Sequence, residues 1–358
     1  MNEERGSRYE FLDALRGVAI LAVMLLHFGA RGRAADDQLV HARLWPFVSH
    51  GYLGVQLFFV LSGYCITAAM QSAARNPMRF RVFIQRRLRR ILPPYWWSLL
   101  LTVAMSTISC FVMHKGWFEI VPLTACDWAI NICLLQEPLH APSANVVYWS
   151  LSIEIQFYLV MTLCLLKVDW TEYFLVVMSL ISMLYRAFPV FPSFYGTILA
   201  LWPQFVCGIG AYYLITGRNR FVLTPWCLLG TVVATILLSW RHEPGIWLPD
   251  GRFTFPAKVI FCIVIALVIV VLHPFDARLM RGRCVRWLAA LGCISYTLYL
   301  IHEPIGTRIF NLGERFTGLE QLWWLAYVGV AFACTFAIGM PFFVYCERPW
   351  LSQRGATR

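Results

Sequence analysis

Charged residues are scarce in this chain. Only 14% of its 358 residues are charged, whereas 59% are hydrophobic and the mean hydropathy is +0.63. That balance excludes an ordinary soluble domain. Several apolar runs approach about 20 residues, the length with which a helix crosses the hydrocarbon core of a bilayer. These runs lack the alternation of a membrane β-barrel. The sequence therefore predicts an all-α, polytopic integral membrane protein.

Signatures of metal binding, disulfide bonding and cleavage are also missing. The twelve cysteines form no CxxC pair and lie mostly in apolar segments, so we interpret them as small core hydrophobes. We expect no metal site and no bound cofactor. Acidic residues interrupt the approach to the first apolar run, and no small-residue cleavage site follows it. This run is therefore predicted to be an uncleaved first span rather than a signal peptide.

The apolar runs predict about ten transmembrane helices in a single domain over residues 9–349, with short tails at 1–8 and 350–358. Residues 117–136 are less apolar, and we interpret them as a re-entrant or interfacial helix, with an eleven-span arrangement as the alternative. No internal repeat or low-complexity tract is visible. The predicted spans lie near residues 11–29, 51–71, 91–112, 146–166, 171–187, 196–215, 222–240, 255–272, 287–306 and 323–345.

Basic residues exceed acidic ones by eleven, but they occur in short clusters between apolar runs. Such clusters indicate membrane orientation rather than nucleic-acid binding. The predicted loop over residues 75–90 carries seven arginines and no acid, which assigns this loop and both termini to the cytoplasmic side. Lipid headgroups account for much of such a run. Arginine without lysine also suits planar, bidentate recognition of phosphate.

The first span sets one arginine and one histidine into an apolar helix. Arg16 and His27 are eleven positions apart, so on a helix they share one face and lie about 16 Å apart along the axis. Polar groups of this kind are costly in a membrane unless they are paired, and they predict a functional site. The alternative for Arg16 is a structural ion pair with Asp13 or Glu347.

Other polar residues fall in later spans. Glu154 is predicted about two turns into a span that enters from the outer side, close to the depth of His27. It either faces a cation or imidazole, or is a packing carboxylate held by Ser62, Ser150 or a tyrosine. Tyr299 and His302 are three residues apart and lie along one helix face, where His302 has either a site-lining or a structural role.

A series of short motifs in a fixed order resembles the bacterial acyltransferase type 3 family. Each motif is weak alone, but together they extend from the first span to the last. They are Arg16 and His27 with ten residues between them, Phe58-Phe-Val-Leu-Ser-Gly-Tyr64, Arg87-x-x-Arg90 before Ile-Leu-Pro-Pro-Tyr, Trp149-Ser-Leu-Ser-Ile-Glu-Ile-Gln-Phe-Tyr158, Ser295-Tyr-Thr-Leu-Tyr-Leu-Ile-His302 and Glu347-Arg-Pro349.

The resemblance implies transfer of an acyl group, usually acetyl, from cytoplasmic acyl-CoA to a hydroxyl of a sugar or glycan at the bacterial inner membrane. Under this hypothesis His27 is the general base and Glu154 orients or balances its imidazolium. Arg16, Arg87 and Arg90 hold the polyanionic CoA. The residues expected to line the site are Ser62, Tyr64, Trp149, Tyr299 and His302.

The sequence departs from the family pattern at Ile155, where many relatives carry a second acid, so Glu154 is the single carboxylate of its motif. No fused hydrolase-like domain is expected. The expected partners are acyl-CoA, membrane lipids and a glycan whose lipid linkage is left open. The rival class is a transporter or flippase that uses the buried His, Glu and Arg residues as a path, but it predicts inverted repeats. Tryptophans predicted near the outer face could stack on sugar rings, namely Trp45, Trp117, Trp149, Trp247, Trp323 and Trp324.

Overall fold

Helices form nearly all of the chain that the computed structural model describes, which comprises residues 9–30, 48–114, 116–188, 196–243, 245–246, 248, 252–317 and 321–351. Every predicted span falls on a helix except the one near 287–306, which falls across the break between two helices. The longer helices are α1 (Phe11–Gly29), α3 (Leu53–Ala74), α4 (Arg79–Met113), α7 (Trp149–Cys164), α8 (Thr171–Ala187), α9 (Ile198–Thr216), α10 (Thr224–Ser239), α11 (Phe255–Leu272), α13 (Arg283–Cys293), α14 (Ser295–Thr317) and α15 (Gln321–Phe342).

Eight helices in the described ranges are long and apolar enough to cross a membrane. The pair α13 and α14, bent by 71° at a short break, makes a ninth when it is taken as one span. α10 has 16 residues and is shorter than these. The all-α polytopic architecture is therefore confirmed, and the predicted number of ten is reached only when α10 and the bent pair are both included. Large apolar side chains such as Leu100, Phe111 and Val271 face outward, as expected for surfaces in contact with lipid.

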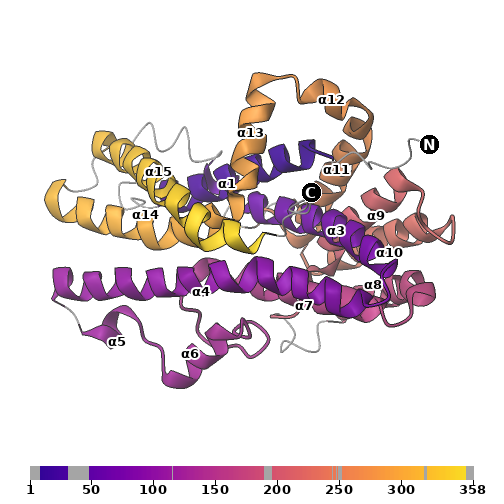
Figure 1. Cartoon of the computed structure of the whole chain (residues 1–358), viewed down its shortest axis with the longest axis horizontal. Coiled ribbons are helices and arrows are strands. Elements are labelled where there is room, and N and C mark those ends of the chain that lie inside the picture. The colour runs from indigo at the N-terminus through magenta and orange to yellow at the C-terminus, as the bar shows by residue number, and fades with distance from the viewer. Residues whose placement is uncertain are drawn as a thin grey trace.

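The arginine run belongs to a helix rather than to a loop. α4 begins at Arg79 and continues for 35 residues through Pro93 and Pro94, so the predicted loop over 75–90 is wrong for most of its length. Arginine and leucine both favour helices, and no helix-breaking residue stands between Arg79 and Pro93. In Figure 1, α4 runs beneath α14 and α15 along much of the molecule.

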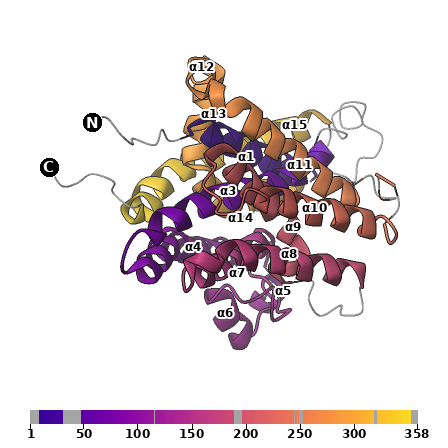
Figure 2. The same ribbon diagram turned by 90° about the vertical axis from the view of Figure 1, so that its right-hand side faces the viewer.

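Residues 117–136 do not cross the membrane. They form α5 (Trp117–Ile120) and α6 (Ala125–Ile132), and the eight residues of α6 span only about 12 Å. The end of α6 packs against the middle of α4, where the Tyr95 hydroxyl donates to the Asn131 carbonyl at 2.7 Å. Figures 1 and 2 show α5 and α6 on the flank of α4 that faces away from the other helices. The eleven-span alternative is therefore wrong.

The next helix, α7, also starts beside the middle of α4. The hydroxyl of Tyr148, which directly precedes α7, lies 2.9 Å from the Ser98 hydroxyl. Beyond the other end of α7, Nε of Arg79 donates to the Leu165 carbonyl at 2.7 Å. α7 therefore runs antiparallel to α4 and covers only the half that adjoins Arg79, which determines the depth of the side chains on α7.

α14 starts inside the bundle, and a residue from beyond the last long helix caps it. A carboxylate oxygen of Glu347 accepts the Thr297 N–H at 3.1 Å and the Thr297 hydroxyl at 2.5 Å. The Ser295 hydroxyl donates to the Gly292 carbonyl at 2.8 Å, across the break from α13. Because the first N–H groups of a helix have no partner within it, the buried Glu347 satisfies a group that would otherwise be orphaned.

Glycines bring several helices into direct backbone contact. A Cβ atom on Gly63 of α3 would overlap the Phe205 carbonyl of α9, and one on Gly208 of α9 would overlap the Val60 carbonyl of α3. Gly54 of α3 makes a similar close approach, because a Cβ there would overlap the Ala19 carbonyl of α1. Small residues at such crossings are typical of membrane helix pairs.

The cysteines are only partly core residues. Cys164, Cys207 and Cys262 are buried as predicted. The interpretation is wrong for Cys126, Cys133, Cys227, Cys284 and Cys293, which lie on the surface of the chain. Their helices turn one face outward, and a cysteine there is exposed even though its segment is apolar.

Candidate active site

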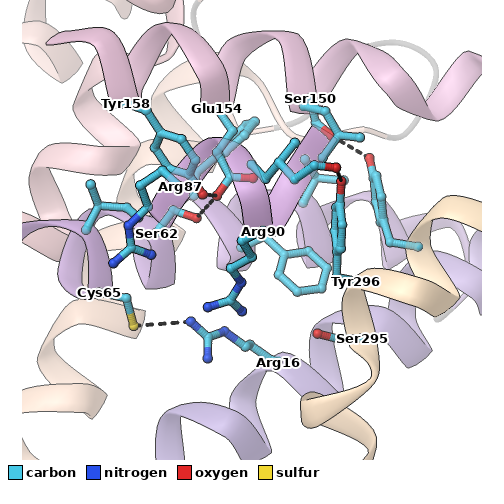
Figure 3. Close-up of a pocket in the computed structure, with 17 residues that line it drawn as sticks. Arg16, Ser62, Cys65, Arg87, Arg90, Ser150, Glu154, Tyr158, Ser295 and Tyr296 are labelled. Atoms are coloured by element: carbon cyan, nitrogen blue, oxygen red, sulfur yellow. Dashed lines mark hydrogen bonds between the residues drawn. The ribbon is translucent and has the colours of Figure 1, made fainter. Parts of the chain in front are cut away.

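A cavity lies where α1, α3, α4, α7 and α14 meet (Figure 3). It holds about 780 Å³ of space that protein atoms do not fill, open solvent included. Each of the five helices contributes at least one polar side chain. The polar residues around the cavity are Arg16, Ser62, Cys65, Arg87, Arg90, Ser150, Glu154, Tyr158, Ser295, Tyr296 and Tyr299.

Three guanidinium groups point into this cavity. Arg87 and Arg90 stand nearly one turn apart on α4, and Arg16 approaches from α1 (Figure 3). Within the described ranges, neither Arg87 nor Arg90 has a hydrogen bond or ion pair, and Nε of Arg87 is buried without a partner. The guanidinium of Arg87 lies 5.7 Å from the centroid of the Phe83 ring. Two neighbouring cations without an ion pair to a described residue suit a polyanionic ligand.

Arg16 is partly neutralised within its own helix. One of its terminal nitrogens is 2.7 Å from a carboxylate oxygen of Asp13, and the other is 3.2 Å from the Cys65 sulfur. The structural pairing of Arg16 with Asp13 is thus found, whereas Glu347 binds Thr297 instead. Arg16 still lines the cavity, so its guanidinium adds positive charge to the wall that Arg87 and Arg90 form.

Glu154 lies among the arginines and not beside His27. Its carboxylate accepts the Ser62 hydroxyl at 2.9 Å and the Tyr158 hydroxyl at 2.7 Å. The predicted depth near His27 is wrong because α7 starts beside the middle of α4, and two further turns carry Glu154 down to the level of Arg90. Glu154 thus has the hydroxyl partners expected of a packing carboxylate, and it also lies among cations, as the other interpretation expected.

The imidazole of His27 meets a second imidazole. Nδ1 of His27 lies 2.9 Å from Nε2 of His302, and their ring centroids are 4.9 Å apart. Neither histidine belongs to the cavity wall. Tyr299 lines the cavity, and its ring centroid is 5.8 Å from that of His302 and 6.0 Å from that of Phe58. The histidine pair is therefore next to the part of the cavity wall that contains Tyr299.

Besides His302, two more residues predicted to line the site lie outside the cavity wall, namely Tyr64 and Trp149. Tyr64 packs between Tyr9 and Tyr212, with ring centroids at 6.2 Å and 5.4 Å. It stands two positions after Ser62 on a helix, which turns it about 200° away from the cavity. Trp149 packs edge-to-face on Phe59 at 6.0 Å. The predicted positions of Ser62 and Tyr299 in the wall agree with the structure.

Several wall residues were not among those predicted. Tyr158 stands four positions after Glu154, a spacing that places both on one helix face and that identifies it from sequence alone. Tyr296 stands three positions before Tyr299 on the same helix face, whereas Cys65 and Ser295 carry no comparable signal. The bend before α14 brings Tyr296 to α4, where its hydroxyl donates to the Ile91 carbonyl at 2.9 Å.

A second cavity lies between the far halves of α4 and α14 and the residues after α5 and α6, with Ser106, Glu303 and Arg308 in its wall. The two cavities have no tryptophan in their walls. Trp324 is buried in the core and Trp323 faces outward. The predicted tryptophan-rich surface is therefore not a feature of either cavity, and Trp45 and Trp247 lie outside the described residues.

The fold and the site define a multi-pass helical membrane protein with an arginine-lined internal cavity. A family model described as an acyltransferase domain matches residues 9–340, and the chain belongs to this acyltransferase 3 family. This confirms the resemblance carried by the motifs. No solved structure matches the chain significantly.

Curated relatives include three from different bacteria. A putative peptidoglycan O-acetyltransferase, YrhL of Bacillus subtilis, is 27% identical over 82% of this chain and 48% of its own length. A putative membrane-bound transacylase, BcsY of Komagataeibacter xylinus, is 26% identical over 83% and 73%. The peptidoglycan O-acetyltransferase OatA of Listeria monocytogenes is 23% identical over 94% and 55%. The chain thus spans about half the length of YrhL and OatA.

Proposed function

We propose that this protein is a membrane-bound O-acyltransferase that moves an acyl group, with acetyl expected, from acyl-CoA to a hydroxyl of a sugar or glycan. Membership of the acyltransferase 3 family supports the reaction class, and the names of the relatives support a cell-wall or polysaccharide acceptor. We treat residues 9–349 as one catalytic domain that needs no metal or bound cofactor. The same comparisons favour an enzyme over a transporter.

One observation carries the donor assignment: Arg87 and Arg90 face one cavity and form no ion pair with any described residue. The CoA phosphates cannot enter hydrocarbon, so they belong at this end of the cavity, where guanidinium groups can bind them bidentately. We place this end in the cytoplasm of a bacterial cell, with both termini on the same side of the inner membrane, because positively charged segments stay inside.

The thioester then belongs toward His27. The rise from Arg16 to His27 is about 16 Å, comparable with the reach of a pantetheine arm. His27 takes the proton of the acceptor hydroxyl while the hydroxyl oxygen forms a bond to the carbonyl carbon of the thioester. The C–S bond breaks, and the thiolate leaves and takes that proton from the imidazolium. The products are the acyl ester and CoA with a free thiol.

Glu154 acts at the donor end in this proposal. Its carboxylate lies in the same cavity wall as the three arginines and is fixed by Ser62 and Tyr158. A single negative charge there offsets part of the repulsion between the guanidinium groups while leaving a net positive wall for phosphate. Glu154 is thus a positioning residue for the arginines rather than the partner of the base.

The test is turnover of acetyl-CoA by the purified full-length chain in lipid nanodiscs. Protein and [acetyl-14C]-CoA are incubated with and without glycan extracted from bacterial envelopes, and release or transfer of the label is followed. His27→Asn removes the base, while its amide can still donate to His302 from about the position of Nδ1. Loss of a general base lowers turnover by about 10²–10⁴-fold.

The matched control is His114→Asn. His114 is exposed and ends α4 in the left-handed conformation, which asparagine tolerates, so this variant should keep normal turnover. Acetyl-CoA should still bind to His27→Asn. Near-normal turnover by a folded His27→Asn protein would refute the role of the base. Wild-type protein that carries label across a vesicle membrane without breaking the thioester would indicate a transporter.

A further inference from the structure

The hydrogen bonds of His302 restrict where its proton can be. Nδ1 of His302 lies 2.8 Å from the Tyr299 carbonyl oxygen and 3.1 Å from the Leu298 carbonyl oxygen. Carbonyl oxygens only accept hydrogen bonds, so Nδ1 must carry a hydrogen. His302 is completely buried, with aromatic rings of Phe28 and Tyr299 near its own. A positive charge on the His302 ring would be costly there. The ring is therefore neutral, with its lone pair on Nε2.

The tautomer of His27 follows from that of His302. The 2.9 Å contact joins Nε2 of His302 to Nδ1 of His27. Because Nε2 of His302 can only accept, Nδ1 of His27 must donate the hydrogen. A neutral His27 then has its lone pair on Nε2. Two backbone carbonyls of α14 thus determine, through one imidazole, which nitrogen of the next imidazole is basic.

We propose that His302 is a positioning residue that holds His27 in the tautomer with a basic Nε2. This inference rests on the proposed function and adds the atom that takes the proton. The acceptor proton moves to Nε2 of His27 and then to the leaving thiolate, while the Nδ1 hydrogen stays bonded to His302. The relation matches that of a base and its orienting group in a catalytic triad, with an imidazole in place of the carboxylate.

The packing of the pair supports an orienting role. The planes of the two rings are inclined by only 28°. The His302 ring is also held by the hydrogen bond from its Nδ1 to the Leu298 carbonyl, one turn earlier on α14. The residue after His27, Phe28, packs against Gly306 of α14, where a Cβ would overlap its ring. Both histidines are therefore fixed by the contact between α1 and α14, and rotation of His27 would break its hydrogen bond to His302.

The decisive measurement is the nitrogen-15 NMR spectrum of His27 in substrate-free protein in nanodiscs, labelled at histidine and assigned with His27→Asn. We expect Nδ1 to be protonated and Nε2 to be unprotonated in the wild-type protein. His302→Gln places an amide oxygen near the position of Nε2 and should preserve this tautomer. His302→Phe fills the space without an acceptor and should shift His27 toward the Nε2-protonated form.

Kinetics provide the second readout. His302→Phe should lower kcat by about 10²-fold or more, as expected when a base is misoriented, and His302→Gln should recover most of that loss. KM for acetyl-CoA should stay unchanged in both, because the arginines bind the donor. A wild-type His27 protonated on Nε2, or a glutamine variant as slow as the phenylalanine variant, would overturn the proposal. The wild-type spectrum needs no turnover, so it separates this failure from failure of the acyltransferase assignment.

Discussion

Replacement of Arg90 by glutamine tests the donor site most directly. Arg90 is half-buried in the cavity wall and has no hydrogen bond or ion pair with a described residue. A charge-assisted hydrogen bond contributes about 1.5–3 kcal/mol, so Arg90→Gln should raise the Kd for acetyl-CoA about 10- to 150-fold. The amide fills part of the space, and no buried acid loses an ion pair. The expected effect is therefore on binding rather than on folding.

Binding is measured by calorimetry with acetyl-CoA and protein in nanodiscs, at low and at high salt. The wild-type Kd should rise with salt more steeply than that of Arg90→Gln, because one phosphate contact has been removed. Arg89→Gln is the control: Arg89 is the adjacent residue, is exposed and lies over the Trp350 ring at 6.0 Å, outside the cavity. Equal Kd values for Arg90→Gln and the wild type would refute the phosphate site, as would an equal loss in Arg89→Gln.

Three further predictions concern stability. Arg87→Met removes a guanidinium whose Nε is buried without a partner, which costs about 1–3 kcal/mol. Tm of the ligand-free protein should therefore rise while stabilisation by acetyl-CoA falls, and an unchanged Tm would argue against this cost. Gly208→Ala forces a Cβ into the Val60 backbone and should lower Tm, whereas Gly210→Ala, with open space around it, should not. Equal shifts in Tm would contradict the close packing of α9 on α3. Glu347→Ala leaves the buried Thr297 N–H unpaired and should lower the free energy of unfolding, measured by denaturant titration, by about 1–3 kcal/mol. Glu347→Gln should stay closer to the wild type, and equal losses in the two variants would contradict a capping role.

Local sequence features predicted the helices but not their depths. Apolar runs located each span because a helix in lipid must be apolar over its whole length. The depth of α7 depends instead on long-range contacts, such as the bond between Tyr148 and Ser98, and no periodicity reveals these. Glu154 was consequently placed too close to His27. The start of α4 was misjudged for a different reason, since a helix continues beyond the membrane wherever the residues allow it.

The predictions for the site also succeeded where they rested on local sequence and failed where they depended on long-range packing. Arg87 and Arg90 were predicted to act together because the Arg87-x-x-Arg90 motif of the family resemblance pairs them, and the structure places both in the cavity wall. The contact between His27 and His302 joins residues 275 positions apart, and only the packing of α1 on α14 brings it about. Tyr64 was misplaced because a motif gives its residues in order without saying which face of the helix turns inward.

The cap on α14 has a consequence for the order in which the protein is made. The wall formed by Ser295 and Tyr296 depends on the start of α14, and the carboxylate that satisfies this start comes from Glu347, 50 residues later than Thr297. A nascent chain that has inserted α14 but not yet released Glu347 from the ribosome holds an orphaned N–H inside the bundle. This cavity wall therefore takes its final shape only after Glu347 has left the ribosome, and translation arrested before Glu347 would leave the earlier helices inserted but this wall incomplete.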